Sequence, residues 1–133
     1  MDVPSDYVPQ DYDIPYAPPD SGFGDYVRLN NLYEEIEQEI DQLREHEYRA
    51  AQFESEYRMK ISTLTAKERM HGTPVTVISD LVRGDENIAR LKLEWKKAEA
   101  DAKASSHLIF LKKDQSAMLT DAIKHDWYRP SNA

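Results

Sequence analysis

The sequence predicts an all-α protein: a long antiparallel helical hairpin or coiled coil with a short connector helix, preceded by a disordered N-terminal tail. Three observations lead to this prediction. Charged residues make up 32% of the chain and there are only four glycines, a composition typical of long helices. Residues 25–70 and 86–128 lack proline and glycine and carry apolar residues at spacings of three and four. Residues 1–24, in contrast, hold five of the seven prolines.

The predicted tail, residues 1–24, is acidic as well as proline-rich. Residues 1–25 contain six aspartates and no lysine or arginine, and closely spaced prolines exclude a helix. The unit Asp-Tyr followed shortly by proline occurs twice, in residues 6–9 and 11–16, and is a candidate linear motif. The alternative is a tail that only solubilises the protein. If the motif binds a partner, the expected contact residues are Tyr7, Pro9, Tyr12, Asp13, Ile14, Pro15 and Tyr16.

The hairpin is predicted to occupy residues 25–129, and its first helix spans about residues 26–70. Apolar or small residues recur there in the pattern of a coiled-coil seam, with the acids Glu47 and Glu54 interrupting it. A helix of this length needs a partner along its side. The expected seam residues are Leu29, Leu32, Ile36, Ile40, Leu43, Ala50, Tyr57, Ile61 and Leu64.

The connector is predicted to hold a short helix at about residues 74–82. Gly72 ends the first helix, and Thr73 offers a capping hydroxyl before a proline at the first helical position. Gly84 is expected to be a left-handed stop before Asp85 caps the next helix. So short a helix is stable only when it is docked on the hairpin.

The last helix is predicted to span about residues 86–128 and to carry two apolar rows. The second row begins near the middle of the helix, so the seam shifts there or a second surface is present. It comprises Leu108, Leu111, Gln115, Met118 and Ala122. The first row is the seam, interrupted by Lys112 and Ser116, and comprises Ile88, Leu91, Trp95, Ala98, Ala102, Ser105, Ile109, Leu119 and Ile123.

Charge favours folding the two long helices back on each other. In an antiparallel hairpin, the acidic stretch 34–47 would lie beside Lys112, Lys113 and Lys124. Exposed ion pairs contribute only a few tenths of a kcal/mol each, so they select orientation more than they stabilise. The same seam could instead close between two chains, which leaves a homo-oligomer as an alternative.

The sequence argues against an enzyme and against a cofactor. It has no cysteine, no glycine-rich phosphate loop and no nucleophile elbow. His46 and His107 could approach each other across two helices, but isolated histidines predict no metal site. The acidic balance argues against direct nucleic-acid binding, because phosphate contacts need a basic face. No signal peptide or membrane span is expected, so we predict a cytoplasmic protein that does not bind a membrane.

Two resemblances suggest a setting. Residues 65–69, 72–76, 81–85 and 95–100 resemble small, mostly uncharacterised helical-hairpin proteins of temperate bacteriophages, over about residues 55–128. Such proteins are commonly encoded among early genes for replication or recombination, which would place this chain in the host cytoplasm. Residues 11–16 are similar to the acidic tip of bacterial single-stranded-DNA-binding proteins, which binds many replication and repair proteins. Here Tyr16 replaces the terminal Phe, and the motif is internal.

These patterns lead to three functional hypotheses. The first is a protein-interaction module, a phage-type accessory protein whose tail binds a replication, recombination or other host protein of unknown identity. The second is a structural or assembly protein, such as a scaffold or virion component, in which the helices form an obligate oligomer. The third is an inhibitor of a host defence or DNA-binding protein, because an acidic tail can imitate the charge of nucleic acid.

Overall fold

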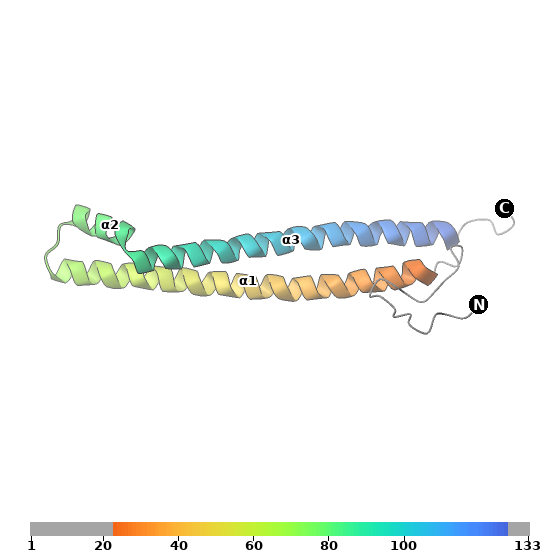
Figure 1. The fold of residues 1–133 in the computed structure, drawn as a ribbon, viewed down its shortest axis with the longest axis horizontal. Helices are drawn as coiled ribbons and strands as arrows, with labels where there is room; N and C mark the ends of the chain where they lie inside the picture. Colours follow the sequence, from red (N-terminus) through yellow and green to blue (C-terminus); the bar gives the residue numbers. More distant parts are fainter. Residues whose placement is uncertain (1–22, 128–133) are drawn as a thin grey trace, which may run out of the picture. The chain divides into compact units, whose positions relative to one another are not determined.

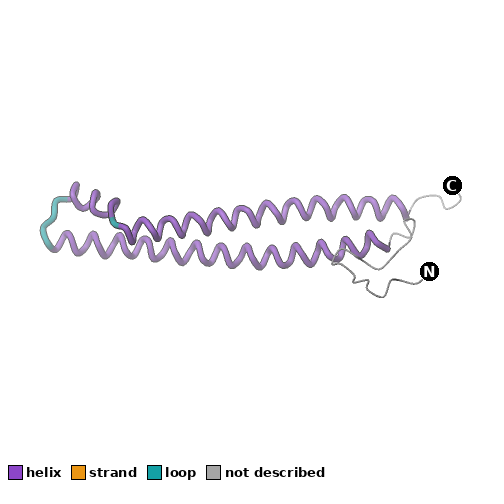
Figure 2. Tube along the Cα trace, in the orientation of Figure 1, coloured by secondary structure: helices purple, strands orange, loops and turns teal. Residues whose placement is uncertain are grey.

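The computed structural model describes residues 23–127, which form three helices and no strand. They are α1 (Phe23–Met70), α2 (Val75–Gly84) and α3 (Glu86–Trp127), labelled in Figure 1. Within the described range, only the short loops between these helices are not helical (Figure 2). The predicted all-α helical hairpin is therefore confirmed. The predicted tail falls outside the described residues, except for Phe23 and Gly24, which belong to α1.

Two compact units are present, and α1 and α3 contribute to both. The described part of the first unit is residues 23–37 and 110–127, and the second unit is residues 38–109. In each unit, a segment of α1 and a segment of α3 lie side by side and run antiparallel (Figure 1). Helix α2 belongs to the second unit.

The end of α1 is closed by hydrogen bonds to its own last turn. Gly72 has a φ of 75°, a conformation that glycine adopts without a steric penalty. Its N–H donates to the carbonyl of Arg69 (3.0 Å), and the N–H of Thr73 donates to the carbonyl of Glu68 (3.1 Å). This pair of bonds defines a Schellman motif. The side chain of His71 also approaches the carbonyl of Lys67, with Nδ1 at 2.8 Å. These contacts satisfy carbonyls that the helix end would leave without partners.

Helix α2 starts one residue later than predicted and without a hydroxyl cap. The Thr73 hydroxyl donates to Glu68 Oε2 (2.8 Å) instead, so Thr73 completes the end of α1. Pro74 takes the N-cap position, and its carbonyl accepts the first bond of α2 from the N–H of Ile78 (3.0 Å). Ile78 is the buried residue of this helix. A helix of ten residues gains its stability from such docking.

The prediction that Gly84 is a left-handed stop is wrong. Gly84 is the last residue of α2, and Gly72 is the one described residue with a positive φ. Asp85 makes the turn instead, because it adopts an extended conformation (φ −71°, ψ 123°). Its N–H donates to the carbonyl of Val82 (3.4 Å), and its Oδ1 accepts from the N–H of Ile88 (2.9 Å). Asp85 therefore closes α2 and caps α3 without a left-handed residue.

The buried side chains of α3 form one row at alternating spacings of three and four. This spacing is the heptad pattern of a helix packed against one neighbour. Trp95, Ala102, Lys112 and Leu119 continue the row and are half-buried. The buried members are Ile88, Leu91, Ala98, Ser105, Ile109, Ser116 and Ile123.

Candidate interaction surfaces

The seam between α1 and α3 contains most of the predicted seam residues, at different depths. No residue of the described range with a large side chain is completely buried, as expected for a core made by two helices. Ile36, Leu91, Ile109 and Ile123 are buried. The half-buried set is Leu32, Leu43, Tyr57, Ile61, Trp95 and Leu119.

Ile40 differs from its predicted place, because it is 40% exposed. The half-buried residue at this level is Glu39, and further along α1 His46 and Phe53 are half-buried. The strict alternation of three and four that starts at Leu29 reaches all three of them. The apolar character of Ile40 moved the predicted register by one residue, which corresponds to about 100° around the helix.

An aromatic and cationic cluster surrounds Trp95 in the second unit. The rings of Tyr57 and Trp95 lie 5.6 Å apart at an angle of 41°. Lys96 Nζ is 4.3 Å from the centroid of the Trp95 ring, and the Arg58 guanidinium is 5.9 Å from it. Arg58 also donates two hydrogen bonds to Glu54, at 3.0 and 3.2 Å. Cations over an indole face add to the energy of burial, so this cluster anchors the unit.

The first unit contains an ion pair between the two helices. Lys112 Nζ lies 3.8 Å from Glu35 Oε2, and the lysine side chain is only 24% exposed. Lys112 and Glu35 belong to the two charged groups that the sequence predicted to meet. Ser116, the next position of the seam, donates to the carbonyl of Lys113 (2.7 Å), which satisfies its hydroxyl within α3. The seam of this unit is therefore partly polar.

His46 brings a polar atom into the seam of the second unit. Its Nδ1 is buried, and no hydrogen-bond partner lies within reach among the described residues. Tyr57 contacts Trp95, and the two helices run antiparallel from this point. Eleven residues before Tyr57 on α1 is His46, and eleven residues after Trp95 on α3 is Ser106, so these two lie at the same level, next to the buried Ser105. A buried polar atom without a partner lowers stability by about 1–3 kcal/mol.

Replacing this imidazole should therefore stabilise the protein. We expect His46→Leu to raise the free energy of unfolding by about 1 kcal/mol, since the apolar side chain removes an unsatisfied group. Urea denaturation followed by circular dichroism measures the change. His107→Leu is the matched control, because His107 is exposed on α3. A loss of stability in His46→Leu that His107→Leu does not share would contradict this prediction.

A second row of exposed side chains lies on α3, one residue before each seam position from 105 to 123. We call it the outer row. It begins one turn earlier than the predicted second stripe, at Ala104. Leu108 is 42% exposed, Leu111 59% and Met118 72%. One residue turns the chain by about 100°, so the outer row lies on the side of α3, next to the face that packs on α1. Its members are Ala104, Leu108, Leu111, Gln115, Met118 and Ala122, all on the single helix α3.

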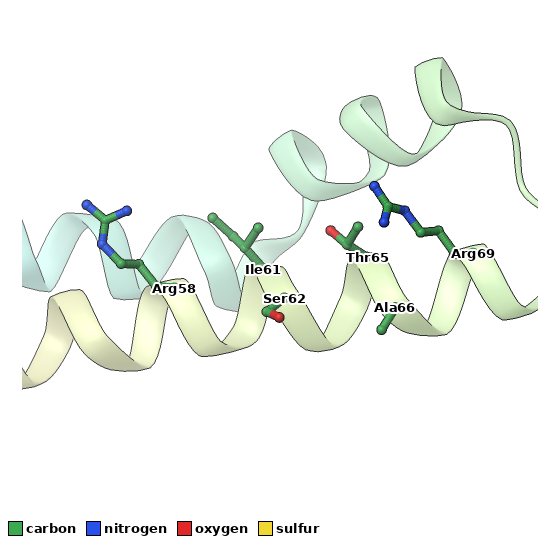
Figure 3. A pocket seen from close by; sticks show the side chains of 6 residues that line it. All are labelled: Arg58, Ile61, Ser62, Thr65, Ala66 and Arg69. Atoms are coloured by element: carbon green, nitrogen blue, oxygen red, sulfur yellow. The ribbon is translucent and has the colours of Figure 1, made fainter.

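An open depression lies on the last turns of α1. It has a volume of about 640 Å³, and Figure 3 shows Arg58 and Arg69 near its two ends. These arginines are eleven residues apart, or about 16 Å along the helix, which is too far for both to hold one small anion. Arg58 is moreover paired with Glu54. The depression therefore lacks the converging groups of an anion site. Its other lining residues are Ile61, Ser62, Thr65 and Ala66.

The predicted tail motif, Tyr7, Pro9, Tyr12, Asp13, Ile14, Pro15 and Tyr16, lies outside the described residues. No group of three or more His, Asp or Glu side chains suited to a metal ion is found in residues 23–127. In the same range, no helix is both long and apolar enough to cross a membrane.

Comparisons with protein-family models, with curated proteins and with solved structures find no match.

Proposed function

We propose that this chain is a non-enzymatic protein-interaction module, in which the hairpin is a scaffold and the N-terminal tail binds a protein partner. The observation that supports this proposal is the pairing of α1 with α3 in each unit, through Tyr57 and Trp95 in one and Glu35 and Lys112 in the other. A seam that is filled by the chain's own helices is not available to a partner. Binding then falls to the tail and to the outward faces of the helices.

The tail fits this role by its chemistry. Residues 1–22 carry five aspartates and no lysine or arginine, interspersed with tyrosine, isoleucine and proline. A partner that binds it needs a basic groove with apolar pockets. The resemblance to the acidic tip of single-stranded-DNA-binding proteins makes tip-binding replication and repair proteins the first class to test. We propose that the chain is a phage-type accessory protein that works in the cytoplasm of a host cell.

The tail proposal is tested with Tyr12→Ala combined with Ile14→Ala in the full chain. We expect this variant to bind a purified tip-binding replication protein at least tenfold more weakly, because each removed side chain fills a pocket. Isothermal calorimetry measures the affinity, and a synthetic tip peptide should compete with the unchanged chain. Ser5→Ala with Gln10→Ala is the control, since it changes the same tail outside the motif.

Two results would refute the tail proposal. One is equal affinity of the Tyr12/Ile14 variant and the control variant. The other is binding that weakens with salt and is displaced by DNA but not by the tip peptide. This second result would favour an inhibitor that imitates nucleic-acid charge, because such binding depends on electrostatics more than on pockets.

A further inference from the structure

Helix α3 carries two rows of side chains, the seam row and the outer row. The seam row contacts α1, and the outer row lies about 100° away on the same helix. Helices in four-helix bundles have such paired rows, because each helix packs against two others. The outer row exposes Leu108, Leu111 and Met118 on a surface that is otherwise rich in charge. A further helix packed on this row would bury all three side chains.

The spacing of the outer row is the same in both directions along α3. Its steps are four, three, four, three and four residues, from Ala104 to Ala122. When α3 is laid antiparallel on a copy of itself, centred at residue 113, Leu108 faces Met118 of the other copy and Ala104 faces Ala122. Leu111 then faces Gln115. Every residue of the row meets another member of the row, as a two-fold interface requires.

The side-chain sizes fit this alignment. The alanines at the two ends let the helices approach closely, while Leu108 and Met118 fill the layers between the ends and the centre. Gln115 is the one polar member of the row. A polar residue at a core position of a coiled coil selects register at some cost in stability. The alignment therefore places two equivalent layers, each pairing Gln115 of one copy with Leu111 of the other, on either side of the two-fold axis.

The chain's own tail is a poor occupant of this row. Asp114 and Asp121 are exposed along one edge of the outer row, and Glu35 lies beside Lys112 next to the other edge. Residues 1–22 bring five further negative charges and no positive one. Like charges would oppose docking of the tail. A second α3 brings no net charge in residues 110–127, where three acids balance three bases.

We propose that two copies of this chain pair through the outer rows of their α3 helices, antiparallel and centred at residue 113, to form a four-helix bundle. The dimer goes beyond the tail-binding function and does not depend on it. Near the axis, Asp114 of one copy approaches Asp114 of the other, so added salt should strengthen the dimer by screening this repulsion.

Sedimentation equilibrium of the full chain tests the proposal. The unchanged 15.4 kDa chain should give twice its monomer mass in the micromolar range. Leu111→Glu combined with Met118→Glu should give the monomer mass, because two charges would be buried in each copy. Both side chains are exposed in the single chain, so circular dichroism should show unchanged helix. Phe110→Glu is the control: this side chain is 65% exposed but lies off the row, and the variant should remain a dimer.

The register is tested by cross-linking, since the chain has no cysteine. Leu108→Cys and Met118→Cys are made separately, mixed and oxidised. The antiparallel alignment predicts a disulfide between the two different variants in preference to either self-pair. The proposal is overturned by a monomer up to about 1 mM, by a dimer that survives the double glutamate variant, or by predominant self-pairs. None of these results affects the tail variant, so the two proposals can fail separately.

Discussion

Trp95→Ala should lower the free energy of unfolding by about 3 kcal/mol. The indole packs against Tyr57 at 5.6 Å and lies under Lys96 at 4.3 Å, so truncation removes both burial and two ring contacts. A loss of this size is a large fraction of the roughly 5–15 kcal/mol that stabilises a typical domain. Urea denaturation followed by circular dichroism, at one fixed protein concentration, measures it.

The control for this prediction is Leu93→Ala on the same helix. Leu93 is 55% exposed, so its truncation should change stability by less than about 0.5 kcal/mol. Equal losses in the two variants would mean that the Trp95 cluster does not anchor the second unit. A smaller loss in Trp95→Ala than in Leu93→Ala would point to the same conclusion.

Ala98→Leu should destabilise the hairpin by about 2 kcal/mol. Ala98 is 1% exposed, the lowest value among the buried residues of the seam, and its small side chain lets the two helices approach. Three additional carbons at this position force the helices apart or the neighbouring side chains off their rotamers. Leucine and alanine are both good helix formers, so the effect reports packing. Thermal and urea denaturation both measure it.

Ala100→Leu is the matched control, two residues further along α3. Ala100 is exposed, so the same added carbons should reach solvent and change stability by less than about 0.5 kcal/mol. A stable Ala98→Leu protein would show that the helices are not in close contact at this level.

The elements of the fold could be predicted from the sequence because helix periodicity and chain breakers are local signals. The seam row of α3 was readable in full, including Lys112 and Ser116, since its spacing never departs from three and four. On α1 the same reading fails at Ile40, where an apolar side chain lies one residue past the half-buried Glu39. Hydrophobicity alone assigns Ile40 to the core, whereas the regular spacing of three and four residues from Leu29 selects Glu39.

The cap chemistry was less predictable, because it depends on which partner each group meets. Thr73 has the right residue type for an N-cap, yet its hydroxyl bonds to Glu68, which precedes it by five residues. Gly84 has the right type for a left-handed stop, yet the extended backbone of Asp85 makes the turn without it. The Nδ1 of His46, which has no hydrogen-bond partner among residues 23–127, gives no signal in the sequence, because its burial depends on how the seam packs.

The turn at Gly72 has a consequence for how the chain folds. All of its hydrogen bonds join residues at most five apart, between Lys67 and Thr73. Closing so short a loop costs little chain entropy, so the reversal of direction can form before α3 is in place. Once α1 and α3 make contact near this reversal, the next residues along the two helices are brought close together. Pairing of α1 with α3 can then spread away from the turn. Each further contact then closes only a short additional loop, so even Glu35 and Lys112, which are far apart in the sequence, can pair at a small entropic cost.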